Sequence, residues 1–207
     1  MKEIEIVAKA LPKEAWNKLA ETTCNTFEKL IYPLTATTEG IGKLIQTKFE
    51  SLNVQQQIIA AKCLEETSAK IKYKQPEEHV AIKPLVIYEA LENTDQQTDN
   101  TIRSLWSNLL AREFTEGSIH PEIAKILSKI TSQDALLLLK IAEKDAGPIS
   151  VMVLKAFASK ITLGLLNEKR SFNHVHLENL DLIQEIELVW RLTTTGREFM
   201  RCVSDLK

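Results

Sequence analysis

The stretch "TIRSLWSNLLAREFTEGSIHPEIAKIL", residues 101–127, decides the fold. Hydrophobic residues recur in it at i, i+3, i+4, i+7 and i+8, which is the spacing of one α-helical face: Ile102, Leu105, Trp106, Leu109 and Leu110. The other face carries Arg103, Ser107, Asn108 and Arg112. Gly117 can take the left-handed conformation that ends a helix, and Pro121 suits the first turn of the next one. The stretch therefore predicts two consecutive helices, with Trp106 as a core anchor.

Helical patterns also precede this stretch. Amphipathic spacing predicts helices over residues 12–32, 41–52, 54–71 and 85–92, with Asn53 as the cap of the third. In the second of these helices, Ile41, Leu44, Ile45, Phe49 and Leu52 are predicted to share the apolar face. Residues 72–84, with two prolines and mixed charges, read as an extended connector. Thr94 and Gln97 have the spacing of a capping box for the central helix.

The last third of the chain changes character. Thr131 and Asp134 mark the start of a helix that runs to Gly147, and residues 151–161 form another. "HVHLENLDLI" reads as one helix with Leu177 and Leu180 inward. "IQEIELVWRLT" is rich in strand-forming residues and predicts two strands with a turn near Glu187. "TTTGREFMRCVSDL" returns to helix, with Phe199 and Val203 spaced to pack.

These patterns predict a mainly α protein in two parts. Residues 1–130 form a helical bundle with a connector near 72–84, and residues 131–207 form a winged-helix-like α+β unit with a short two-stranded hairpin. The net charge of -2 gives no overall attraction to nucleic acid or to an anionic membrane. We predict a cytoplasmic protein on three grounds. The three cysteines are well separated and suggest no disulfide framework, the N-terminus carries charges where a signal peptide would be apolar, and no uninterrupted apolar run is long enough to span a membrane.

No residues form a recognisable catalytic or cofactor-binding motif. His174 and His176 are two apart, so on a helix they point about 200° apart and cannot easily share a metal ion. His120 is expected to precede or cap the helix that Pro121 opens. Cys24 and Cys63 lie on apolar-rich helices and are expected to be packing residues rather than nucleophiles. We therefore predict no catalytic residue, no cofactor and no metal.

Four pieces of the sequence, taken in order, resemble a known family: "PLTATTEGIGKL" from Pro33, "LWSNLLA" from Leu105, "IHPEIAKIL" from Ile119 and "LTTTGREFMRCV" from Leu192. They are similar to the Abi-alpha family, bacterial proteins named for abortive infection, which is a form of anti-phage defence. The resemblance implies a biological process and supplies no catalytic motif. The residues that we take as its structural signature are Leu105, Trp106, Leu109, Leu110, His120, Pro121, Leu192, Thr193, Gly196 and Phe199.

Four classes of function remain open on the sequence. The first is a non-enzymatic defence protein that binds an unknown protein partner or self-associates. The second is a winged-helix transcriptional regulator, which Glu178, Asp181, Glu185 and Glu187 disfavour because phosphate contacts need cations. The third is a membrane-perturbing toxin acting through the amphipathic run 151–165, a pattern that a core helix shares. The fourth is an enzyme whose site is assembled from distant residues.

Overall fold

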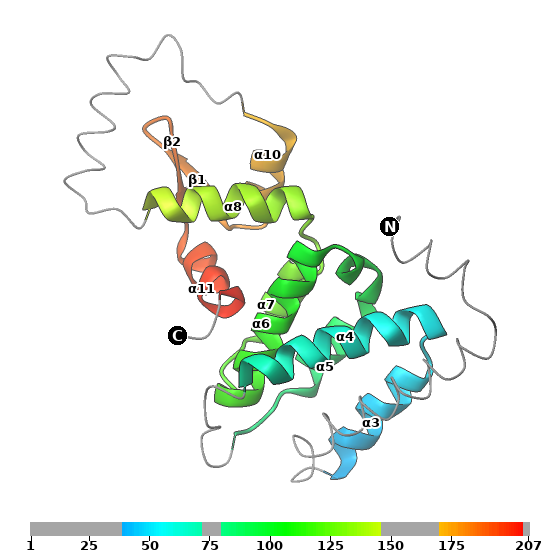
Figure 1. Ribbon diagram of the computed structural model, residues 1–207. Helices are drawn as coiled ribbons and strands as arrows, with labels where there is room; N and C mark the ends of the chain where they lie inside the picture. Colours follow the sequence, from blue (N-terminus) through cyan, green and yellow to red (C-terminus); the bar gives the residue numbers. More distant parts are fainter. Residues whose placement is uncertain (1–38, 72–79, 146–169, 205–207) are drawn as a thin grey trace. The chain divides into compact units, whose positions relative to one another are not determined.

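The computed structural model describes residues 39–71, 80–145 and 170–204, and Figure 1 shows the helices and strands that they form. The described residues are mainly helical, with a two-stranded antiparallel sheet near the C-terminus. They group into two compact units, one formed by residues up to Lys129 together with those from Cys202, and one formed by Ile130–Arg201. Among the described residues, none of the helices combines the length and apolar character needed to cross a membrane.

Five α-helices and one 3-10 helix are described in the first unit. They are α3 (Glu39–Glu50), α4 (Val54–Ile71), α5 (Pro84–Glu92), η1 (Thr94–Thr98), α6 (Asn100–Glu116) and α7 (Pro121–Leu127). The helix predicted over residues 54–71 is confirmed, and Pro84 extends the next predicted helix by one residue at its first turn. Helix α4 packs along α6, and α5 packs against α3 and α7 (Figure 1).

Helix α6 is the central helix of the first unit. It ends as predicted, because Gly117 is left-handed (φ 60°) and its N–H donates to the Glu113 carbonyl. The predicted start is wrong: Thr94 and Gln97 belong to η1, and Asp99 caps α6 through bonds from the N–H groups of Thr101 and Ile102. An aspartate directly before the helix can accept those N–H groups, so no distant capping box is needed.

The amphipathic pattern of α6 indicated an exposed polar face, but in the structure most of this face is buried. Trp106 and Leu109 are fully buried, and so is Ser107, while Arg103 and Asn108 are each 5% exposed. The helix is enclosed on both sides because α4 covers the face that carries the polar residues. The apolar stripe of α3 is also narrower than predicted: Ile45 and Phe49 are buried, whereas Leu44 is 53% exposed.

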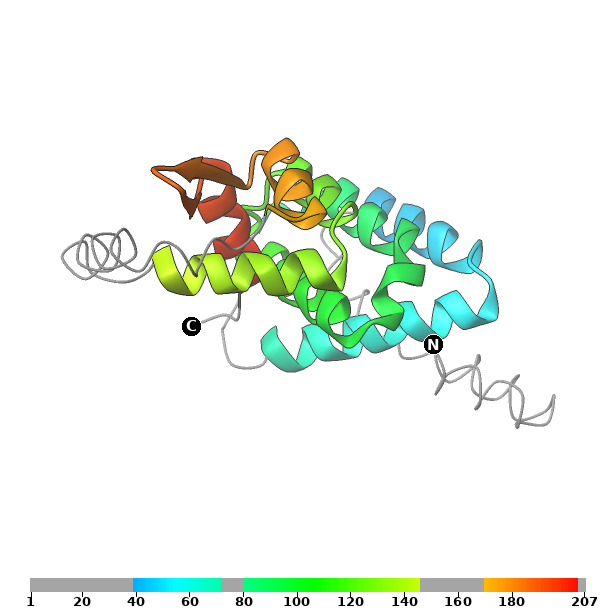
Figure 2. The same ribbon diagram turned by 90° about the horizontal axis from the view of Figure 1, so that it is seen from above.

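The second unit contains α8 (Ser132–Asp145), α10 (Phe172–Asn179), β1 (Ile183–Ile186), β2 (Val189–Leu192) and most of α11 (Thr194–Val203). Figure 2 shows α10 and the hairpin on the same side of α8. Ser171 and His174 form a capping box for α10, so this helix begins before the predicted segment. Leu177 is buried as predicted, but the helix ends at Asn179 and Leu180 is its half-exposed C-cap.

The hairpin and the last helix are confirmed. Strands β1 and β2 pair antiparallel, from Ile183 opposite Leu192 to Ile186 opposite Val189. This register leaves a two-residue loop that contains Glu187, as predicted. Phe199 and Val203 of α11 are both buried. Several predictions concern parts of the chain outside the described residues. These are the helices over 12–32 and 151–161, residues 72–79 of the connector, Cys24, the side chain of Ile41 and Gly147.

Candidate functional site

The signature residues of α6 and α7 lie in the core or cap a helix. Trp106, Leu109 and Leu110 are buried, and Leu105 is half-buried at the edge of the same face. His120 is exposed and is the N-cap of α7, where its Nδ1 accepts a bond from the Glu122 N–H at 3.2 Å. Pro121 occupies the first position of α7. These residues specify how α6 turns into α7.

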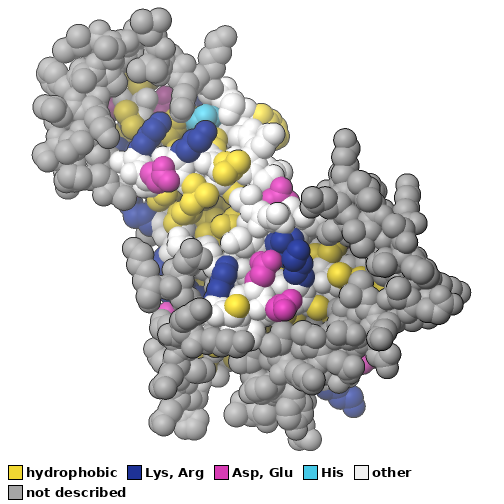
Figure 3. Space-filling view, viewed as in Figure 1, with side chains coloured by type: hydrophobic (Ala, Val, Ile, Leu, Met, Phe, Trp, Pro, Cys, Tyr) yellow, Lys and Arg dark blue, Asp and Glu magenta, His cyan; other side chains and the backbone are white. Residues whose placement is uncertain are grey.

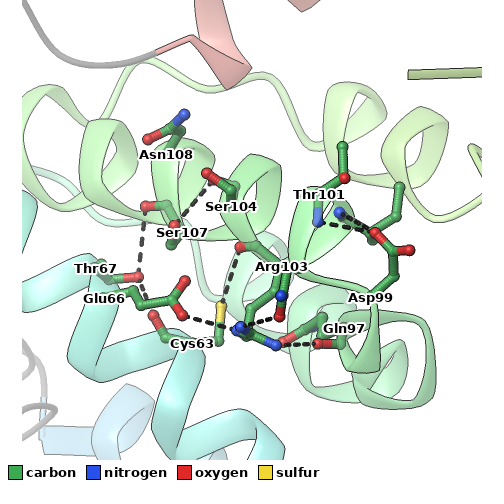
Figure 4. Close-up of polar contacts among 12 residues, drawn as sticks. Cys63, Glu66, Thr67, Gln97, Asp99, Thr101, Arg103, Ser104, Ser107 and Asn108 are labelled. Carbon is green, nitrogen blue, oxygen red and sulfur yellow. Dashed lines mark hydrogen bonds and ion pairs between the residues drawn. The ribbon is translucent and has the colours of Figure 1, made fainter. Parts of the chain in front are cut away.

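A polar layer joins α4 to α6, and Figure 4 shows the part of it around Arg103. The Arg103 guanidinium donates to the Glu66 carboxylate at 2.8 Å, to the Gln97 carbonyl at 3.0 Å and to the Asn100 side chain at 2.6 Å. Three acceptors therefore surround a nearly buried cation, which is the condition for burying it without a large penalty.

The second half of this layer is built on Lys70. Its ammonium donates to the Ser107 hydroxyl at 2.7 Å, to the Asn108 side chain and to the Ser104 carbonyl. Asn108 in turn donates to the Val203 carbonyl at 2.8 Å. A lysine beside a serine is also the geometry of one class of hydrolase nucleophile. Ser107 is fully buried and donates its own proton to the Ser104 carbonyl, so in this arrangement the pair holds two helices together.

Two further buried groups have shifted pKa values. Burial, together with the nearby Glu66 carboxylate, raises the pKa of the Cys63 thiol to about 12, so the thiol stays protonated and unreactive at neutral pH. Cys63 is buried as predicted. Glu113 is fully buried, and burial raises its pKa although its oxygens accept the N–H groups of Lys83 (2.5 Å) and Ile119 (3.1 Å). The Glu113 carboxylate therefore binds the backbone of both the segment before α5 and the segment after α6.

The histidines of α10 are separated as the sequence predicted. His174 is buried, with its ring 4.8 Å from that of Trp190, whereas His176 is half-buried and stacks on Phe172. His176 Nε2 lies 3.9 Å from the Asp134 carboxylate. Among residues 39–71, 80–145 and 170–204, no three His, Cys, Asp or Glu side chains come together in a way that could hold a metal ion.

The signature residues between β2 and α11 form a second structural clamp. The Thr193 N–H donates to the Leu182 carbonyl, and its hydroxyl contacts the Asp181 carbonyl and the Gly196 N–H. A Cβ added to Gly196 would lie 1.9 Å from the Leu182 oxygen, so only glycine allows the start of α11 to approach this turn. Leu192 and Phe199 are buried on either side of the clamp.

The tip of the hairpin has unusual backbone geometry. Glu187 and Leu188 have φ values of 52° and 63°, so both loop residues are left-handed, as in a type I′ turn. Such turns favour Asn, Asp and Gly, because a left-handed backbone costs other residues about 1–2 kcal/mol each. Leu188 is nevertheless 64% exposed, and Ile186 beside it is 40% exposed. The tip therefore presents apolar side chains to solvent on a strained backbone.

An open cleft lies between α3 and α5. It has a volume of about 470 Å³ and is lined by Lys43, Leu44, Thr47, Lys48, Ser51 and Tyr88. The Lys48 ammonium is 4.8 Å from the centre of the Tyr88 ring and pairs with Glu92. The cleft is thus partly apolar, with two ammonium groups on one wall.

Comparison with known proteins was made at the level of families, curated proteins and solved structures. A model of the family described as abortive infection alpha matches residues 55–189, well over half of the chain. The chain belongs to the abortive infection alpha family. No curated protein and no solved structure matches the chain.

The abortive infection alpha match confirms the family predicted from the sequence. It spans α4 to the first residue of β2 and so contains "LWSNLLA" and "IHPEIAKIL". The pieces that start at Pro33 and Leu192 lie outside the matched residues. The matched residues include the α4–α6 polar layer and the hairpin tip. The strained backbone of the tip was not identified from the sequence. Two non-glycine residues in the loop were the signal that could have revealed its strain.

Proposed function

We propose that this chain acts in anti-phage defence of the abortive-infection type, and that it acts by binding another protein molecule. The family to which it belongs supports the process. The hairpin tip supports the mode of action, since an exposed leucine in a strained turn contributes no burial to the chain's own fold. This tip is the observation that carries the proposal of a binding function.

The buried polar groups support the same proposal. Ser107 and Lys70 bond to each other across two helices, the Cys63 thiol stays protonated, and Glu113 is enclosed by backbone N–H groups. Groups engaged in this way contribute to a rigid scaffold, which can present a binding surface in a fixed geometry. The described apolar side chains that face solvent then become the candidates for contact.

Phage challenge tests the proposed function directly. Cells that express the chain should give fewer plaques than cells with an empty vector, and at high phage excess the infected cells should die without releasing progeny. Equal plaque numbers and equal progeny release, with the protein present at normal levels, would contradict a role in abortive infection.

The order of elements in the second unit favours a more specific fold and a second candidate function. We propose a winged-helix-like arrangement, because α10 is followed directly by the β1–β2 hairpin and α11. In DNA-binding examples, such a helix enters the major groove. Here the hairpin carries Glu185 and Glu187, which repel phosphates, so we rank DNA binding second. Saturable binding of random duplex DNA with a steep salt dependence, measured by fluorescence anisotropy, would reverse this order.

A further inference from the structure

The hairpin tip carries charge of one sign as well as apolar surface. Residues 183–190, "IQEIELVW", contain two carboxylates, and the one cation of the hairpin, Arg191, lies away from the loop, opposite Gln184. Glu185 and Glu187 are both exposed, on either side of Ile186 and next to Leu188. A surface with this pattern is repelled by nucleic acid and by anionic lipid. It fits an apolar recess whose rim is positively charged.

The α3/α5 cleft of the first unit has the complementary pattern. Leu44 is 53% exposed in the cleft, and Leu85, on the same face of α5 as Tyr88, is 44% exposed. Lys43 is exposed at the cleft wall, and Lys48 is held by Glu92 and Tyr88. An ammonium has three donors, so pairing with Glu92 leaves Lys48 able to bond a second carboxylate. At about 470 Å³ the cleft lies in the range of pockets that take small ligands, roughly 300–1,000 Å³, and has room for aliphatic side chains.

We propose that the hairpin tip of one copy of this chain docks into the α3/α5 cleft of a second copy. Leu188 and Ile186 would meet Leu44 and Tyr88, while Glu187 would meet Lys43. The proposal deepens the proposed function, because it rests on the idea that the chain acts by binding and it names the partner as the chain itself. Since tip and cleft are different surfaces, the interface is heterologous and joins copies head to tail.

The strain at Glu187 and Leu188 is consistent with this role. An Asn-Gly loop would close the same hairpin at lower cost and would remove the exposed leucine. Leu188, although left-handed, keeps an exposed apolar side chain in the loop of the hairpin. Docking would remove that apolar side chain from water, which favours association. A contact of this limited size is expected to be weak and concentration-dependent.

Sedimentation velocity of the purified full chain over a wide range of concentrations tests the proposal. The wild type should shift from monomer to larger species as concentration rises, and added salt should weaken the shift because charges contribute to the contact. Leu188→Asn should stay monomeric, and it should fold normally because asparagine tolerates the left-handed conformation. The cleft variant Lys43→Glu/Leu44→Gln should also stay monomeric, since both changes are at exposed positions and introduce good helix formers.

A matched control comes from α8. Figure 3 shows hydrophobic side chains gathered over this helix, where Leu136 and Leu139 are exposed. Leu136→Gln/Lys140→Glu removes an exposed leucine and reverses a lysine, as the cleft variant does, but on α8, which supplies no residue to the hairpin tip or to the cleft lining. This variant should associate like the wild type. Loss of association in it would mean that general surface changes, rather than the docking contact, control assembly, and would overturn the proposal.

Mixing the two monomeric variants gives the sharpest result. The Leu188→Asn chain keeps an intact cleft, and the cleft variant keeps an intact tip, so an equimolar mixture should form a one-to-one dimer. A wild type that is monomeric throughout, or a mixture that forms no dimer, would overturn the proposal. The phage assay separates this failure from failure of the proposed function: a monomeric wild type that still protects cells contradicts only the docking contact.

Discussion

Gly196 shows how a single residue controls the second unit. Its α-carbon faces the Leu182 carbonyl so closely that an added Cβ would lie 1.9 Å from the oxygen. The same carbonyl accepts the Thr193 N–H at 3.1 Å, so it cannot move away without loss of a buried hydrogen bond. The glycine therefore fixes the approach of α11 to the turn before β1.

We expect Gly196→Ala to lower the free energy of unfolding by about 3 kcal/mol, the upper end of the usual cost of forcing extra atoms into a packed site. Thr194→Ala, two residues earlier at an exposed position, should change it little. Chemical denaturation of the two variants and the wild type measures the difference. Equal stability of all three would show that the turn at Leu182 adapts easily.

Glu113 gives a prediction about pH at the same scale. Burial raises its pKa from the ordinary value of 4.5, so the folded state holds the proton more strongly than the unfolded state. Stability from this group is therefore fully present below pH 4.5 and is lost as pH rises from there through the folded pKa.

Glu113→Gln removes the titrating group, so the unfolding free energy of the variant should not fall with rising pH on account of this position. The difference between wild type and variant should change across the window that opens at pH 4.5 and should be constant below it. Denaturant titrations at several pH values measure this difference. Parallel curves for the two proteins over the whole range would contradict the raised pKa.

At the scale of elements, local patterns predicted most helices and the hairpin. The helix at residues 54–71, the end of α6 at Gly117 and the two strands around Glu187 follow from periodicity, glycine chemistry and strand-forming residues. The start of α6 was predicted wrongly because Asp99 was an available cap closer to the helix. Burial of Arg103 and Asn108 could not be predicted, since it depends on partners about 37 and 95 residues away in the sequence.

The candidate site was less accessible to sequence reasoning than the fold. The cleft combines α3 with α5, and its lining depends on how these helices pack. The exposure of Leu44 is a tertiary property, because its helical spacing alone placed it in the core. The signature residues were recognisable, but the structure gives them roles in packing, capping and close approach.

The strained loop leads to a prediction for the hairpin. Glu187→Asn/Leu188→Gly installs residues that favour a type I′ turn, and it should raise the free energy of unfolding by about 1 kcal/mol. Thermal unfolding of the variant and the wild type checks this. A lower melting temperature in the variant would mean that Leu188 makes a stabilising contact, and its exposure would then not signify a binding role.

At the scale of the whole molecule, each of the two units carries one of the surfaces that we propose for binding. The first has a cleft with two lysines on one wall, and the second has an acidic apolar tip. Buried polar groups rigidify the first unit, and the Thr193–Gly196 clamp rigidifies the second. Fixed surfaces on rigid units suit a protein that works by assembly, because little order has to be created on binding.

Phage plating on cells that express the Leu188→Asn variant tests the central claim, that the chain defends cells by binding through its hairpin tip. The wild type and the Leu136→Gln/Lys140→Glu control should reduce plaque numbers equally, and Leu188→Asn should give the plaque numbers of the empty vector at equal protein level. Full protection by Leu188→Asn would contradict the claim.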